Sequence, residues 1–106
     1  MSLRVVLCTA PETEAADLAR ELVTRRLAAC CNIVPGLRSI YRWKGELCDD
    51  GEALLLIKTR ADRVAELSAA LVELHPYDCP EVIALPLEEG EGNPAYLQWL
   101  MDESSP

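Results

Sequence analysis

Residues 28–44 read AACCNIVPGLRSIYRWK, an extended pattern that one proline-glycine pair interrupts. At about 3.3 Å per residue, a strand of this length would span roughly 55 Å, whereas strands usually have about five or six residues. Such a strand must bend at Pro35-Gly36 or project past its own domain. Gly45 then offers a reversal into Glu46-Leu47. The sequence therefore predicts a β-hairpin with one very long arm.

The two faces of this arm differ beyond the bend, because successive strand residues point to opposite sides of a sheet. Aromatic residues at alternating strand positions are typical of interface packing, and stacking against a ligand is the alternative for Tyr41 and Trp43. The arm therefore has an apolar side that needs a partner. One face carries Leu37, Ser39, Tyr41 and Trp43, and the other carries Arg38, Ile40, Arg42 and Lys44.

The segments on either side of the arm alternate between strand and helix patterns. Residues 3–9 are apolar and β-branched enough to predict a strand. Residues 14–27 repeat apolar side chains at helical spacing, with Thr13 as the expected N-cap. Residues 53–58 form a continuous apolar run, which predicts a strand buried on both faces.

A second helix and a fourth strand follow. Asp62 is the expected N-cap of a helix whose apolar residues repeat at helical intervals until Pro76 ends it. Residues 82–87 predict the last strand, and Pro86 places that part of it at an edge or a bulge. A loop over 88–93 precedes a short helix over 94–101.

This order of elements predicts an α+β fold, a ferredoxin-like βαββαβ sandwich with a long bent β-hairpin and a short C-terminal helix. Residues 1–106 fit a single domain, because a second domain would have too few residues for a core of its own. Two long helices cover only one face of the sheet, whereas the strands over 53–58 and 82–87 are apolar on both sides. The second face therefore needs cover, and self-association is its simplest source.

The chain is acidic, with ten basic and eighteen acidic residues and a formal net charge of −8. Surfaces that follow phosphates use Lys and Arg, so we expect no nucleic acid partner. No apolar stretch approaches the ~20 residues that cross a bilayer, and the start lacks the longer apolar region of a signal peptide. We therefore expect a soluble, cytoplasmic protein that makes no use of a membrane. The acidic residues expected on solvated loop faces are Glu46, Asp49, Asp50, Glu52, Glu88, Glu89 and Glu91.

The cysteines fit neither a disulfide framework nor a structural zinc knuckle, because their number is odd and no Cys-x-x-Cys pair occurs. Free cysteine usually behaves as a small buried hydrophobe, and we expect that role for most of them. The five are Cys8, Cys30, Cys31, Cys48 and Cys79.

The single histidine lies in the segment 75–81, HPYDCPE, where an imidazole, a thiol and two carboxylates accompany two prolines. Proline fixes its own backbone angle and restricts the residue before it, so His75 should end a helix and Cys79 should be extended. A stiff segment with these groups is either a binding site or a structural lock. The local sequence leaves both interpretations open.

Two kinds of catalysis match these residues only in part. An imidazole activates a nearby thiol, but no oxyanion hole or substrate pocket is identifiable in the sequence. Acylphosphatase-like chemistry would need an anion-binding loop with a dedicated arginine, which residues 8–13 lack. We therefore expect no catalysis.

Two charged residues flank the later strands. Lys58 ends the apolar run over 53–58, and Glu81 precedes the last strand. If those strands are neighbours, the two charges are expected to form a structural ion pair. The alternatives are an ion pair at an interface or polar walls of a cleft between subunits.

Short motifs along the chain form a specific combination in their order and spacing. They are CTAP at 8–11, RLAACCNIVPG at 26–36, SIYRWKG at 39–45, IKT at 57–59, HPY at 75–77, PE at 80–81, ALP at 84–86 and YLQW at 96–99. Together they closely resemble the divalent-cation tolerance family, usually called CutA. The resemblance covers almost the whole chain.

This resemblance implies a ferredoxin-like subunit in a compact homotrimer, with long hairpins packed against neighbouring subunits. It also implies a role in tolerance to divalent metals, especially copper, without catalysis. The architecture is similar to that of the trimeric PII signalling proteins. The alternative function is therefore a PII-like signalling or scaffold trimer that binds a small metabolite or a protein partner at clefts between subunits.

Copper-binding members of the family imply a candidate metal site. Their cysteine in the first strand corresponds to Cys8, and their last histidine after the second helix corresponds to His75. The position before it is Leu74, where related chains carry a second histidine, so one ligand is missing. Cys79, Glu81, water or a second subunit would have to complete a site for Cu²⁺ or another divalent cation. Thiolate and imidazole are suitable donors for copper.

Overall fold

The computed structural model describes residues 2–106 and contains four strands, three α-helices and one short 3₁₀ helix. None of the described helices is long and apolar enough to cross a membrane. In chain order the elements are β1 (Leu3–Ala10), α1 (Glu12–Thr24), β2 (Cys30–Trp43), β3 (Glu46–Arg60), η1 (Ala61–Arg63), α2 (Val64–Leu74), β4 (Ile83–Pro86) and α3 (Pro94–Glu103).

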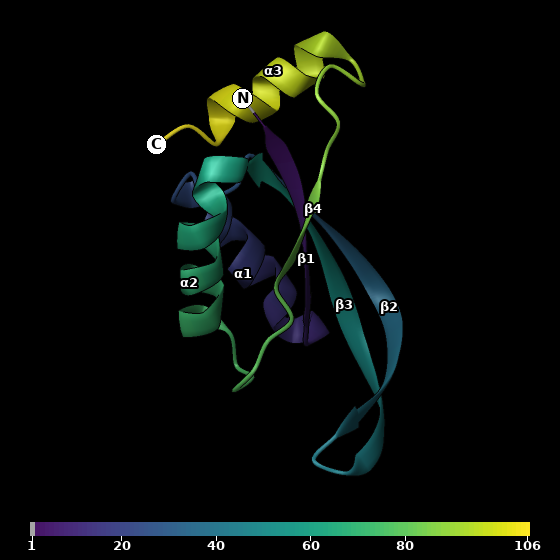
Figure 1. Ribbon diagram of the computed structural model, residues 1–106. Coiled ribbons are helices and arrows are strands. Elements are labelled where there is room, and N and C mark those ends of the chain that lie inside the picture. The colour runs from purple at the N-terminus through teal and green to yellow at the C-terminus, as the bar shows by residue number, and fades with distance from the viewer. Residues whose placement is uncertain (1) are drawn as a thin grey trace.

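The strands form one antiparallel sheet in the order β2-β3-β1-β4. Helices α1 and α2 lie side by side on one face of this sheet, and α3 lies across one end of it (Figure 1). The predicted α+β ferredoxin-like arrangement is confirmed. Strand β4 is an edge strand. This position accommodates Pro86, because the N–H that proline lacks is not needed for pairing on the outer side of the sheet.

The long hairpin bends where the sequence predicted a bend. The pairing of β2 with β3 shifts register between Val34 and Leu37, and Gly36 has a φ of 73° there. The hairpin reverses at Lys44-Gly45, whose φ values of 49° and 81° suit the two-residue turn that matches strand twist. Residues 37–52, here called the arm, project past the rest of the molecule (Figure 1).

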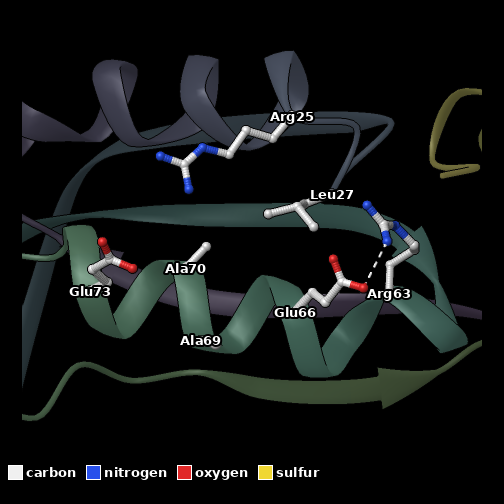
Figure 2. Close-up of a pocket in the computed structure, with 7 residues that line it drawn as sticks. All are labelled: Arg25, Leu27, Arg63, Glu66, Ala69, Ala70 and Glu73. Atoms are coloured by element: carbon white, nitrogen blue, oxygen red, sulfur yellow. Dashed lines mark ion pairs between the residues drawn. The ribbon is translucent and has the colours of Figure 1, made fainter.

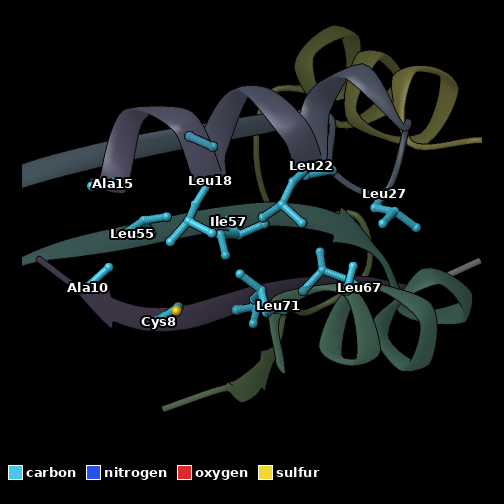
Figure 3. Packing of buried hydrophobic residues seen from close by; sticks show 14 of the residues in the cluster. Cys8, Ala10, Ala15, Leu18, Leu22, Leu27, Leu55, Ile57, Leu67 and Leu71 are labelled. Carbon is cyan, nitrogen blue, oxygen red and sulfur yellow. The ribbon is translucent and has the colours of Figure 1, made fainter. Parts of the chain in front are cut away.

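The core lies between the sheet and the pair of helices (Figure 3). Cys8 faces Leu55 across the strands, and both are completely buried beneath the helices. The same layer includes Val6, Leu22, Ile57, Leu67 and Leu71. A smaller cluster of Leu3, Ala29 and Leu100 packs α3 against the end of the sheet.

In the described part of the chain, the opposite face of the sheet has no comparable cover. Leu54 and Leu56 are only partly buried, while Ala53, Leu55 and Ile57 on the helix side are buried. The prediction of a strand buried on both faces is therefore wrong for the single chain. Within residues 2–106, no helix packs on the other side of β3 except α3 at its end, so one face is left open.

Both predicted N-caps are also wrong. Helix α1 begins at Glu12 after Pro11, and Thr13 lies inside its first turn. Asp62 lies in η1, ahead of α2, and its carboxylate forms an ion pair of 2.7 Å with Arg60. The end of α2 was predicted correctly, since His75 has an extended backbone immediately before Pro76.

Candidate functional site

His75 is buried, and both of its ring nitrogens have partners. Its Nε2 lies 2.7 Å from the carbonyl oxygen of Thr9, and its Nδ1 accepts a hydrogen bond of 3.1 Å from the backbone N–H of Tyr77. These partners assign the neutral tautomer with the proton on Nε2, because a carbonyl can only accept. The histidine therefore fastens the end of α2 to β1.

Cys8 lies on β1 next to Thr9, and its side chain is completely buried. Burial, followed by the charges of Glu81, Cys31 and Glu52, raises the pKa of the Cys8 thiol to about 12. The thiolate is the form that attacks carbon centres and binds metals. At neutral pH the Cys8 side chain is therefore a protonated thiol.

The structure brings Cys8 and His75 to the same region, but it does not assemble a metal site around them. Within residues 2–106, no group of three or more His, Cys, Asp or Glu side chains has a geometry that could hold a metal ion. Cys79 is exposed in the loop after α2, and Glu81 is exposed just before β4. Glu81 lies close enough to Cys8 for its charge to act on the thiol.

Glu52 is a functional candidate that the sequence did not predict. It was expected on a solvated face, yet only 6% of it is exposed, and it accepts a hydrogen bond of 2.9 Å from the hydroxyl of Tyr77. The Tyr77 ring also contacts the His75 ring, with 4.6 Å between centroids. Burial and this hydrogen bond to Glu52 raise the pKa of Tyr77 to about 12, so Tyr77 keeps its proton and remains a donor at neutral pH.

Lys58 and Glu81 do not lie on neighbouring strands. Strand β1 separates β3 from β4, so the condition for an ion pair between them within one chain is not met. Lys58 instead contacts α3, where its Nζ donates to the hydroxyl of Tyr96 at 3.3 Å and lies 5.6 Å from the centre of that ring. The Tyr96 and Trp99 rings stack with centroids 5.6 Å apart. A cation and two half-exposed aromatic rings thus meet where α3 borders the open face.

The aromatic residues of the arm have different environments. The Tyr41 hydroxyl donates to Asp50 at 2.5 Å, and this bond is the main reason that the pKa of Tyr41 is raised. Trp43 pairs with Glu46 beside the turn and is 46% exposed. Within the single chain, Tyr41 is therefore tied to its own arm, while the Trp43 ring is available for contacts outside it.

A hollow of about 310 Å³ lies between α1 and α2, away from all of these residues. Ala69 and Ala70 leave a gap between the helices, and charged side chains border it (Figure 2). Arg63 pairs with Glu66 at 3.2 Å, and Arg25 pairs with Glu21 at 2.7 Å. Both arginines of the hollow are therefore already paired with a carboxylate.

The sheet order, the helix pair and the long arm define a small α+β protein of the ferredoxin-like, PII-like class. The chain belongs to the CutA1 divalent ion tolerance family, whose model matches residues 4–103. It is 52% identical over 101 residues to the divalent-cation tolerance protein CutA of Thermus thermophilus, covering 94% of this chain and 96% of that protein. A solved CutA1 structure from the same organism superposes with a TM-score of 0.91 at 50% identity, over 97% of this chain and 99% of that one.

Two further comparisons bear on function. The structure titled "PII-like protein CutA" from Nostoc has a TM-score of 0.89 at 30% identity, with 99% of this chain and 98% of that one covered. A CutA homologue from Xenopus laevis is 50% identical over 102 residues, which are 95% of this chain and 66% of that protein. The chain thus spans about two thirds of that relative and about half of the mammalian ones.

Proposed function

We propose that the chain acts as a homotrimer in the response to divalent cations and has no catalytic step of its own. The link to cations comes from the family, and the self-association comes from the surface of the subunit. The main support for self-association is the open face of the sheet together with the arm. A cytoplasmic location belongs to the same proposal, although relatives include a protein named as chloroplastic.

The open face supplies a large apolar surface. Leu7 pairs with Leu56 on one side and with Ile83 on the other, so the three side chains share this face. Ile83 is 53% exposed and Leu85 is 49% exposed. Contiguous apolar patches of this kind on soluble proteins usually mark interaction sites. A second copy of the same chain is the partner that would always be present to cover it.

The arm supports the same conclusion. Leu47 is 73% exposed and Ile40 is 63% exposed, and both lie near the tip on the face of the arm opposite to Trp43. A projecting element with unburied apolar side chains gains free energy when it packs against another surface. Three copies related by a rotation axis would let each arm pack on the next subunit and close the assembly.

We further propose that copper or another divalent cation binds at Cys8 and His75. Thiolate and imidazole suit copper, and Glu81, whose charge acts on Cys8, is a candidate for a third ligand. Binding there would require His75 Nε2 to release the Thr9 carbonyl and give up its proton, and the Cys8 thiol would have to lose its proton as well. Groups from a second subunit or Cys79 would complete the coordination.

A copper titration tests this site. If Cys8 and His75 are ligands, the double variant Cys8→Ala/His75→Gln should bind Cu²⁺ far more weakly than the unchanged chain, because both strong donors are gone. Calorimetry and paramagnetic resonance measure the affinity and the ligand set. The variant Cys30→Ala/Cys48→Ala, which removes two other thiols, is the control. Equal binding by the double variant and the unchanged chain would exclude these residues as ligands.

The second candidate function is a PII-like trimer that binds a small anionic metabolite at clefts between subunits. The contact of Lys58 with Tyr96, whose ring stacks on that of Trp99, favours it, since a cation beside aromatic rings suits an anionic ligand with a flat group. Calorimetry with a panel of anionic metabolites is the measurement. If a ligand binds there, Lys58→Met should weaken it about tenfold or more, whereas Lys44→Met at the hairpin turn should not. An equal effect of both changes would contradict a site at Lys58.

A further inference from the structure

Glu52 is a buried carboxylate at the base of the arm. It pairs with Leu37, and this is the first residue pair beyond the register shift in β2. Burying a carboxylate costs free energy unless a donor satisfies it. Within residues 2–106, the hydrogen bond recorded for the Glu52 side chain comes from the Tyr77 hydroxyl. The position of Tyr77 therefore decides whether Glu52 is satisfied in its buried place.

The other strand of the arm is held in a similar way. The carboxylate of Glu12, in the first turn of α1, accepts a hydrogen bond from the backbone N–H of Gly36 at the bend. One acidic group thus secures β2 and another secures β3 where the arm leaves the sheet.

Tyr77 connects Glu52 to the segment 75–81. Its backbone N–H donates to His75 Nδ1, and its ring contacts the His75 ring. The Nε2 of His75 in turn is hydrogen-bonded to the carbonyl of Thr9 in β1. A continuous series of contacts therefore runs from β1 through His75 and Tyr77 to the base of the arm. A displacement of the segment would remove the donor from Glu52.

We propose that the Tyr77–Glu52 hydrogen bond couples the segment 75–81 to the direction of the arm, so that a change in this segment alters self-association. The inference rests on the proposed assembly through the arm. Coupling of this kind is reciprocal, so assembly must also change the surroundings of His75. The segment that carries the only histidine thereby acts as a control point for assembly.

A double-mutant cycle tests the coupling. Tyr77→Phe removes only the hydroxyl and should raise the concentration needed for half-assembly about tenfold or more, because it leaves a buried carboxylate without its donor. In a Glu52→Met background, where no acceptor for the hydroxyl remains, the same change should have a much smaller effect. Tyr41→Phe is the matched control, since it removes a phenol-carboxylate hydrogen bond within the arm itself. Sedimentation velocity measures the extent of assembly at each concentration, and urea unfolding measures the stability of the subunit.

Two independent readouts separate this inference from the proposed function. The ring signals of His75, the only histidine, should shift on assembly in the unchanged chain and shift much less in Glu52→Met. If the chain does not self-associate, the proposed assembly fails, but the coupling still predicts faster hydrogen exchange of the arm amides in Tyr77→Phe. A Tyr77→Phe variant with unchanged assembly and unchanged arm exchange would overturn the coupling, even if its unfolding free energy falls.

Discussion

Replacing Trp43 by alanine should dissociate the assembly while the subunit stays folded. The ring lies beside the hairpin turn, outside both apolar clusters of the subunit, and is 46% exposed in the single chain. In the assembly it is expected to be buried against a neighbour, and truncation of a buried aromatic side chain costs about 3 kcal/mol or more. Sedimentation velocity over a range of concentrations measures the loss.

The control for this experiment is Glu46→Ala, which changes the cross-strand partner of Trp43 at the same tip. It removes little apolar surface and should leave assembly close to that of the unchanged chain. If Trp43→Ala assembles normally but binds a metabolite or cation differently, the ring belongs to a ligand site rather than to the interface.

Replacing His75 by alanine should lower the free energy of unfolding by about 2–4 kcal/mol even when all metal is removed. The change leaves the Thr9 carbonyl and the Tyr77 N–H without their partners in a partly buried region, and each such loss costs about 1–3 kcal/mol. Urea unfolding in the presence of a chelator measures the difference. His75→Gln, whose amide can still donate toward Thr9, should recover part of the stability.

This experiment also separates the two interpretations of the segment 75–81. A loss of stability in the chelator identifies His75 as a structural lock between α2 and β1. A loss that appears only when copper is added would identify it as a metal ligand and would contradict the structural role.

Features that depend on local backbone chemistry could be predicted from the sequence. Pro76 restricts the residue before it, so the end of α2 at His75 was predictable. Pro35-Gly36 and Gly45 likewise marked the bend and the turn of the hairpin, because glycine adopts positive φ without strain. The alternation of apolar segments gave the order of strands and helices along the chain.

Side-chain contacts between distant segments could not be predicted in this way. The partner of His75 is a carbonyl 66 positions away, and Glu52 accepts a hydrogen bond from Tyr77, 25 positions later. Glu52 nevertheless directly precedes the apolar run over 53–58, a position that places it at the edge of the core. The separation of Lys58 from Glu81 depended on strand order, which places β1 between them.

The mass of the particle in solution tests the proposed self-association most directly. Light scattering on the purified chain, repeated over a wide range of concentrations, should give a particle mass three times that of one chain. Trp43→Ala should shift the particle mass toward that of a single chain. A stable particle of a single chain mass at every concentration would contradict the proposal, because the open sheet face and the arm would then remain uncovered.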